Sequence, residues 1–260
     1  MRRIDAAQAG ALFGGRIETP VRAFVQGHMG RAWQSEDGRC AQIVTGDFCF
    51  FAGDADADGA RELAGHVPAD HPSDSLLMLA HDAAWDARIA DVWGDRARRI
   101  RRYRLHADAL RADRLPPQDP PAGYRLAPLD GRLYRAALAQ AWSRDFVSLF
   151  DGEADFLARG LGVAALRGDE LVAAASSYLI YDGGLEIQVQ TRDDHQRRGL
   201  ARCCCAALIA QCLRRGLEPH WDAANGASLR LALCLGYRNG GAYDALEVPS
   251  SVNACTKSER

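Results

Sequence analysis

Four prolines lie within nine residues near the middle of the chain, in the segment LPPQDPPAG at Leu115–Gly123. Proline lacks a backbone N–H and has a fixed φ, so this segment cannot form a helix interior or a central strand. A chain of 260 residues can form one large domain or two smaller ones. We therefore predict a linker at residues 115–123, between an N-terminal mixed α/β region at 1–114 and a second domain at 124–260.

The pattern before the linker mixes strands with helices. The first segment, MRRIDAAQAGALFGG, has a short basic start but no sustained apolar core, so we expect an amphipathic helix rather than a signal peptide. Next, RAWQSEDGRCAQIVTGDFCFFAG predicts a strand, a turn at Asp37-Gly38 and a second strand. A helix is expected in DADADGARELAGHV, a strand in LLMLA, a helix in DAAWDARIADVW and a strand in IRRYRLHAD.

The pattern after the linker is more regular. We expect a strand in YRLAPLD, helices in RLYRAALAQAW and DFVSLFDGEADFLARG, and three antiparallel strands in VAALRG, LVAAASSYLIY and LEIQVQT. A helix from about Arg198 to Arg215 follows, with Gly216 as its C-terminal glycine. A strand in EPHWDA, a helix in NGASLRLALCLG and a strand in YRNGGAYDALEV complete the order β-α-α-β-β-β-α-β-α-β.

The overall charge gives no reason to expect a nucleic acid or a membrane surface as partner. The formal net charge is −2, from 32 basic and 34 acidic residues. No run of about 18 apolar residues predicts a transmembrane helix. One local run, RARRIRRYR, is basic. It is either an anion- or nucleic-acid-binding face or a solvated edge strand whose arginines pair with local acids.

Eight cysteines could indicate a metal site, disulfides or packing. They form no CxxC pair, and none lies beside a histidine pair, so we expect no zinc site. No secretion signal accompanies them, and we expect reduced thiols in a cytoplasmic protein. Cys203, Cys204 and Cys205 would point in directions about 100° apart on a helix, which favours packing over one ligand cluster. No histidine near them in the sequence indicates an activated thiolate, which disfavours covalent catalysis by these cysteines.

The residues QRRGLA, Gln196–Ala201, lie where a strand gives way to a helix. The first N–H groups of a helix have no internal partner and favour an anion. Arginine side chains add charge-assisted bonds to phosphate oxygens, and Gly199 permits close approach of a ligand to the backbone. The segment therefore predicts a diphosphate cradle. The alternative is an arginine-rich helix start on an ordinary surface.

Two motifs at matching spacing resemble the GNAT superfamily of acetyl-CoA-dependent N-acetyltransferases. They are QRRGLA and NGASLRLALCLGY, Asn225–Tyr237. Together with LEIQVQT and LIAQCLRRGLEPHWDAANGAS, they are similar to the bacterial subgroup that includes zwittermicin A resistance acetyltransferases. The resemblance covers roughly residues 145–243. It implies a GNAT fold of the α/β (α+β) class, with a central mixed, mostly antiparallel sheet flanked by helices and preceded by a smaller mixed α/β region.

The resemblance also implies acetyl-CoA as cosubstrate and no metal. In the family the pyrophosphate meets the helix start, and pantetheine runs along a strand that splays from its neighbour, here EPHWDA. Asn225 and Ser228 match positions that touch the coenzyme, although a helix cap and a packing residue would also explain them. The implied coenzyme-binding residues are Val189, Gln190, Thr191, Gln196, Arg197, Arg198, Gly199, Leu200, Ala201, Asn225 and Ser228.

Acetyl transfer to an amine requires a proton acceptor, a polarised thioester carbonyl and often a proton for the leaving thiolate. Glu186 lies on the strand where the family often places a base, on the same face as Gln188 and Gln190. We assign it as base or substrate-binding carboxylate, the alternative being an edge-exposed glutamate. The family's acid is often a tyrosine, whose position here is Ala232.

Two tyrosines could replace that acid. They are Tyr237, which we expect to pack in the core, and Tyr243, which we therefore assign as catalytic. His220 and Asp222, on the strand facing the gap, could bind substrate instead.

Three functions are compatible with these residues. The first is direct acetyl transfer, in a ternary complex, to a primary amine of a small molecule such as an antibiotic. The second has a protein N-terminus or lysine as acceptor. The third is a non-catalytic acyl-CoA-binding sensor, which the missing tyrosine at Ala232 favours and Glu186 disfavours. The resemblance also allows a homodimer formed through sheet edges.

Overall fold

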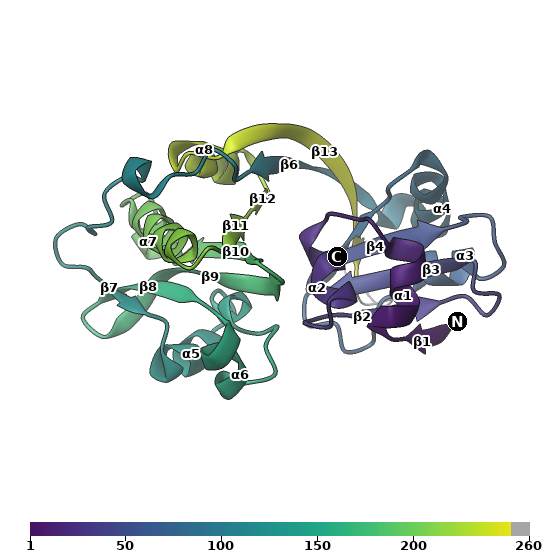
Figure 1. The fold of residues 1–260 in the computed structure, drawn as a ribbon, viewed down its shortest axis with the longest axis horizontal. Helices are drawn as coiled ribbons and strands as arrows, with labels where there is room; N and C mark the ends of the chain where they lie inside the picture. The colour runs from purple at the N-terminus through teal and green to yellow at the C-terminus, as the bar shows by residue number, and fades with distance from the viewer. Residues whose placement is uncertain (251–260) are drawn as a thin grey trace, which may run out of the picture. The chain divides into compact units, whose positions relative to one another are not determined.

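A computed structural model describes residues 1–250, which fall into two compact units (Figure 1). The first unit comprises Met1–Arg101 and the chain from Tyr243 onward, and the second comprises Arg102–Ala242. The chain passes between the units within two strands, β6 (Arg98–His106) and β13 (Arg238–Pro249).

These boundaries differ from the predicted ones. The proline-rich segment lies inside the second unit, where the Cys203 thiol donates to the Asp119 carbonyl at 3.4 Å. The end of β13, predicted to belong to the second domain, pairs with β5 (Ser75–Leu79), so that Leu246 faces Met78 in the first unit. Leu246 and Val248 are buried in the hydrophobic core of that unit, and this burial explains why the strand returns there.

The first unit is mixed α/β, as predicted. Its strands β1 (Arg2–Ile4), β2 (Arg31–Gln34), β3 (Cys40–Thr45) and β4 (Phe48–Gly53) are antiparallel neighbours, and β4 pairs with β5 in parallel. Its helices are α1 (Ala6–Phe13), α2 (Thr19–Val25), α3 (Ala60–Gly65) and α4 (Ala83–Trp93). The single strand predicted after Asp37-Gly38 is wrong, because a second turn at Gly46, with φ +56°, separates β3 from β4.

The second unit has the predicted element order. It contains β7 (Arg125–Pro128), α5 (Gly131–Leu138), α6 (Glu153–Arg159), β8 (Gly162–Arg167), β9 (Glu170–Tyr181), β10 (Gly184–Thr191), α7 (Leu200–Arg214), β11 (Glu218–His220), β12 (Asp222–Ala223) and α8 (Gly226–Cys234). Five strands form one sheet in the order β11-β10-β9-β8-β7, in which β10 and β11 are parallel and the other neighbours antiparallel. Helix α7 covers one face, and α5 and α6 lie on the other (Figure 1). The predicted mixed, mostly antiparallel sheet flanked by helices is confirmed.

Two predicted elements of this unit differ in detail. The helix expected in DFVSLFDGEADFLARG begins only at Glu153, and a short 3₁₀ turn at Arg144–Phe146 precedes it. The buried Ser176 hydroxyl donates to the Phe146 carbonyl at 2.6 Å, which holds this turn against the sheet. The strand expected in EPHWDA is split between β11 and β12. Gly216, with φ +70°, ends α7 as predicted.

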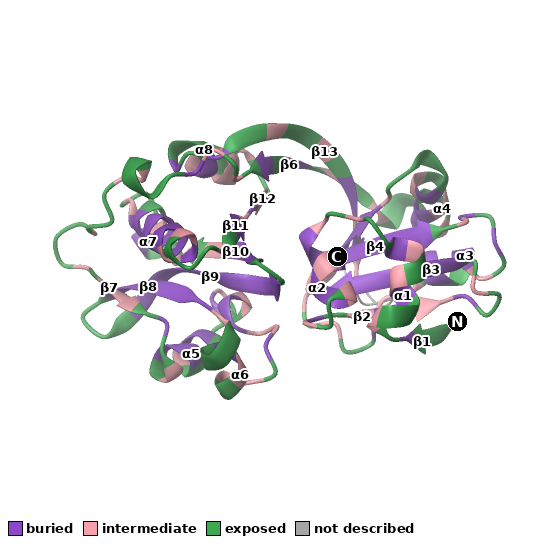
Figure 2. Ribbon diagram, viewed as in Figure 1, coloured by how far each residue is buried: buried purple, intermediate pink, exposed green. Residues whose placement is uncertain are grey.

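The cysteines of α7 are packing residues, as predicted. Cys203, Cys204 and Cys205 are buried on the helix that covers β8, β9 and β10 (Figure 2). On β9, Ala173 and Ala175 share one face, where Cys204 meets Ala175, and they are small enough to let the helix approach closely. Burial raises the pKa of the Cys204 and Cys205 thiols far above its ordinary value, so they remain uncharged.

Within residues 1–250 all seven cysteines are free thiols, and Cys255 lies outside the described residues. No helix in the described part of the chain is long and apolar enough to cross a bilayer.

Candidate functional site

Strands β10 and β11 separate partway along β10. Their parallel pairing runs from Gly184 opposite Glu218 to Glu186 opposite His220 and stops there, although β10 continues to Thr191. After His220 the chain enters β12, which pairs with β6 instead. The pairing of β9 with β10 also shifts register between Glu186 and Ile187. The predicted separation of the two strands is therefore present. From Ile187 onward, the edge of β10 opposite β9 has no strand paired to it within residues 1–250.

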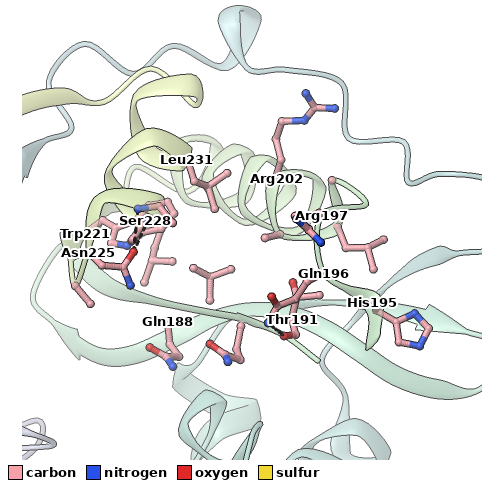
Figure 3. Close-up of a pocket in the computed structure, with 18 of the residues that line it drawn as sticks. Gln188, Thr191, His195, Gln196, Arg197, Arg202, Trp221, Asn225, Ser228 and Leu231 are labelled. Carbon is pink, nitrogen blue, oxygen red and sulfur yellow. Dashed lines mark hydrogen bonds between the residues drawn. The ribbon is translucent and has the colours of Figure 1, made fainter. Parts of the chain in front are cut away.

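A pocket of about 680 Å³ lies at this opening (Figure 3). Its wall combines the end of β10, the loop after it, the first turns of α7 and α8, and one residue of β6. Ten of the eleven predicted coenzyme-binding residues line it: Val189, Gln190, Thr191, Gln196, Arg197, Gly199, Leu200, Ala201, Asn225 and Ser228. Arg198 does not, because it turns back and donates to the Asp194 carbonyl at 3.3 Å.

The start of α7 is open toward an anion. Gly199 is its N-cap residue, with φ +81°, and its first turn has no side-chain cap in the described structure. Arg197 also has a positive φ, +58°, which is uncommon for a residue with a side chain. Successive N–H groups in such a turn, together with the helix dipole, form a concave site that favours negative charge.

Two arginines flank this helix start. Arg197 and Arg202 are exposed, line the pocket and form no hydrogen bond or ion pair with another described residue. Arg202 was not predicted from the sequence. The available signal was its place three residues after Gly199, in the first turn of the helix, where a cation lies near an anion at the helix start.

Side-chain contacts hold the loop between β10 and α7. The Arg192 guanidinium donates to Nε2 of His195 at 2.8 Å, which leaves Nδ1 to pair with the Tyr124 hydroxyl at 2.8 Å. Arg192 also pairs with Glu170 at 2.5 Å, and the Gln196 amide donates to Asp193 at 2.8 Å. The loop that leads to the helix start is thus tied to Tyr124, just before β7, and to Glu170 of β9.

The start of α8 forms another part of the wall. The Asn225 side chain accepts hydrogen bonds from the backbone N–H groups of Ala227 and Ser228, both at 3.0 Å. Asn225 is therefore an N-cap, and both Asn225 and Ser228 line the pocket. Asn225 can therefore cap the helix and still contact a ligand in the pocket, as predicted for it.

Four charged side chains form a chain at the point where β10 and β11 separate. Glu186 is 4% exposed, so the alternative of an edge-exposed glutamate is wrong. One of its carboxylate oxygens lies 2.6 Å from Nδ1 of His220, and the other accepts the Asp222 N–H at 2.7 Å. The Asp222 carboxylate in turn accepts from Nε of Arg102 at 2.6 Å.

The Glu186 carboxylate controls the charge of His220. Burial alone lowers the pKa of the imidazole, but the nearby carboxylate charge and its hydrogen bond outweigh burial and raise the pKa of His220 to about 9. His220 is therefore protonated at neutral pH, as an ion pair with Glu186.

The predicted tyrosines lie in different surroundings. Tyr237 packs against Trp221 and donates to the Pro219 carbonyl at 2.6 Å, and burial raises the pKa of its hydroxyl well above the ordinary value. Its expected place in the core is confirmed. Ala232 is fully buried. Tyr243 belongs to β13 in the first unit and is not among the residues that line the pocket, so its catalytic role stays a prediction.

Three arginines of β6 pair with acids on the surface, as the second interpretation of RARRIRRYR predicted: Arg98 bonds Glu247, Arg99 bonds Asp86 and Arg101 bonds Asp244. Two details of that interpretation are wrong, because β6 lies between β13 and β12 rather than at a sheet edge, and Glu247 and Asp244 are distant in sequence. Arg102 differs, because it is buried, pairs with Asp222 and lines the pocket. The sequence analysis did not single out Arg102, because its partner lies 120 residues away.

Comparisons with known proteins agree with this geometry. Residues 10–246 match the family model described as GNAT acetyltransferase. A solved structure of a GCN5-related N-acetyltransferase-like protein from Streptococcus suis 89/1591 is 33% identical, with a TM-score of 0.83, over 94% of this chain and 98% of that one.

Of two further relatives, one matches only a short segment of this chain and the other matches at low identity. The uncharacterized N-acetyltransferase YdfB of Bacillus subtilis is 32% identical over 85 residues, which is 32% of this chain and only 33% of that protein's length. A tandem GNAT protein from the clavulanic acid biosynthesis pathway matches 96% of this chain and 98% of its own, with a TM-score of 0.54 and 15% identity. The latter similarity concerns the fold alone.

Proposed function

Because the chain belongs to the GNAT acetyltransferase family, we propose that it transfers the acetyl group of acetyl-CoA to a primary amine of a small molecule. The transfer is direct, within a ternary complex. One observation carries the proposal: an uncapped start of α7 lies beside the open edge of β10, and both line one pocket.

The diphosphate of the coenzyme fits the start of α7. The N–H groups after Gly199 supply donors without a side-chain cap, and the guanidinium groups of Arg197 and Arg202 supply charge. Charge-assisted bonds from arginine to phosphate oxygens are among the stronger hydrogen bonds in proteins. Asn225 and Ser228, at the start of α8, would contact the coenzyme from the opposite wall.

The edge of β10 fits the extended, amide-containing arm of the coenzyme. The backbone groups from Ile187 to Thr191 on this side have no neighbouring strand within residues 1–250, so they can pair with amides of a ligand as a further strand would. Bound acetyl-CoA supplies the reactive thioester. Pairing along the edge of β10 would direct the thioester end of the coenzyme toward Glu186 and His220.

Glu186 accepts the proton that the attacking amine loses. Its carboxylate is buried beside the point where the strands separate, and Asp222 N–H and His220 hold both oxygens in place. A positioned carboxylate can contribute about 10²–10⁴-fold to such a reaction. The small-molecule acceptor, including an antibiotic amine, rests on the sequence similarity to the zwittermicin A resistance subgroup.

Release of CoA thiol from acetyl-CoA, measured with a panel of small primary amines and a panel of peptides, tests this proposal. We expect turnover with small amines. Turnover on peptides alone would replace the small-molecule acceptor by a protein or peptide. Coenzyme binding without turnover on either panel would instead support the acyl-CoA-binding sensor, which the buried Ala232 favours.

The variant Glu186→Gln tests the assigned base. We expect kcat to fall by about a hundredfold or more, while acetyl-CoA affinity changes by less than about twofold, because the amide still accepts the Asp222 N–H. The matched control is Glu153→Gln, at a carboxylate that pairs with Arg135 away from the pocket, and it should be near wild type. A normal rate in Glu186→Gln would exclude Glu186 as the base.

A further inference from the structure

The side chains that line the pocket include no acid matched to a leaving thiolate. The hydroxyls of Thr191 and Ser228 are too weakly acidic, and arginines do not give up a proton in proteins. Both ring nitrogens of His195 are engaged, and Asp222 is an acceptor in its pair with Arg102. Outside the lining, the hydroxyl of Tyr237 is bonded to a carbonyl, and position 232 is an alanine. A protein group that protonates the thiolate would therefore lie just beyond these walls.

His220 occupies the position that such a donor needs. It faces Glu186 in the last pair of β10 and β11, and the next residues, Ile187 and Trp221, both line the pocket. Nδ1 is bonded to Glu186, whereas Nε2 has no hydrogen-bond partner within residues 1–250. The side chain is 30% exposed, so the ring is only partly covered by the protein.

We propose that His220 donates, through Nε2, the proton that the coenzyme sulfur takes up as the C–S bond breaks. The inference rests on the proposed acetyl transfer and names His220 as its acid in place of Tyr243, which belongs to the first unit and is not among the residues that line the pocket. His220 thereby takes the role that a tyrosine at position 232 would have in the sequence pattern described above.

The charges around His220 keep this donor protonated. Glu186 on β10, Glu218 on β11 and Asp222 on β12 all act on the imidazole, and Arg102 on β6 pairs with Asp222. Burial favours the neutral ring, but the carboxylates outweigh it and hold the pKa of His220 near 9. An acid with this pKa is protonated at neutral pH and well matched to a thiol.

The step conserves atoms and charge. The amine nitrogen forms a bond to the carbonyl carbon, and the electron pair of the C–S bond leaves with sulfur. His220 Nε2 gives sulfur a proton, and Glu186 takes a proton from the nitrogen. Glu186 then releases its proton to solvent and His220 takes one up, so the products are the amide and CoA thiol and both side chains return to their starting states.

The pH dependence of acetyl transfer tests the inference. The probes are acetyl-CoA and hydroxylamine, which stays uncharged between about pH 7 and pH 10.5, so its own titration does not obscure the profile. Because the protonated form of His220 is active, kcat should be full below its pKa and decline as pH rises through about 9.

The variant His220→Gln should lower kcat at least about tenfold at pH 7 and lose the declining limb, with acetyl-CoA affinity retained. His106→Gln, at an exposed histidine of β6, is the matched control and should keep the wild-type profile. A wild-type rate that stays level or rises through pH 9, or a declining limb retained in His220→Gln, would overturn the inference.

Titration of the His220 ring by NMR gives a readout without turnover. We expect its pKa near 9 in the wild type and a fall toward the ordinary value of about 6.5 in Glu186→Gln. An ordinary pKa in the wild type overturns the inference whatever the activity.

Absence of acetyl transfer from the wild type to any acceptor contradicts the proposed function itself, whereas transfer with an unchanged pH profile in His220→Gln contradicts this inference alone.

Discussion

At the scale of single residues, the arginines of the second unit differ in what they contact. Arg192 and Arg238 are bound in ion pairs with carboxylates. Arg197 and Arg202 have no such partner in the described residues, and both flank the uncapped start of α7. Their charge is therefore available to an anion, which is the role that the proposed function gives them.

Replacement of either arginine should weaken coenzyme binding. A hydrogen bond to a charged group contributes about 1.5–3 kcal/mol, so Arg197→Gln or Arg202→Gln should lower acetyl-CoA affinity by about tenfold or more. The loss should shrink as salt is added, because exposed charges are screened. Calorimetric titration measures both effects. Arg167→Gln, at an exposed arginine of β8 outside the pocket, is the control, and an equal loss there would contradict the assignment.

Most residues that line the pocket near the start of α7 could be predicted from the sequence because they lie in three short contiguous segments. Ten of the eleven predicted residues line the pocket, and only Arg198 turns away. The partnership of Glu186 with His220 could not be predicted. It depends on the register of two parallel strands, and on the end of that pairing at His220, neither of which leaves a local pattern.

At the scale of elements, the separation of β12 from β10 creates the pocket. The backbone of β12 pairs with β6, with Asp222 opposite Arg104, and the Arg102–Asp222 ion pair reinforces this arrangement. Asp222 also holds Glu186 through its N–H. The basic strand thus supports the site through its backbone pairing with β12 and through the Arg102–Asp222 ion pair.

Two neighbouring arginines of β6 allow a matched test of this support. Arg102 and Asp222 have side chains only 10% and 15% exposed, whereas Arg101 and Asp244 are 66% and 38% exposed. Arg102→Met removes the cation that faces a largely buried carboxylate and should lower the free energy of unfolding by about 3 kcal/mol. Arg101→Met should cost less than about 1 kcal/mol. Urea denaturation measures both, and equal losses would contradict a special role for Arg102.

Helices and strands could be predicted from the sequence where the apolar periodicity was strong. The predicted ends of strands were wrong where pairing with a distant strand determines them. EPHWDA has the composition of one strand, but its two halves pair with different neighbours. The turn at Gly46 was missed because nearly every residue of β3 and β4 is buried, so neither strand has the alternating polar pattern that would mark the break between them.

At the scale of the whole molecule, the two units are not two consecutive segments of chain. The C-terminal strand leaves the second unit and pairs with β5, about 170 residues earlier in the sequence. The proline-rich segment, which marks a boundary by composition, instead runs beside α7 through the Cys203–Asp119 contact. Local composition cannot reveal a strand that returns to an earlier sheet, because the pairing partner is distant in sequence.

The central claim is that the start of α7 binds the coenzyme, and titration with acetyl-CoA tests it most directly. We predict micromolar binding by the wild type and none by Gly199→Glu, whose carboxylate would enter the anion site. Gly199→Ala is the control: the nearest atom to its Cβ would be 3.8 Å away, so only the strain of φ +81°, about 1 kcal/mol, is added and binding should persist. Unchanged affinity in folded Gly199→Glu, or no binding by the wild type, would contradict the account.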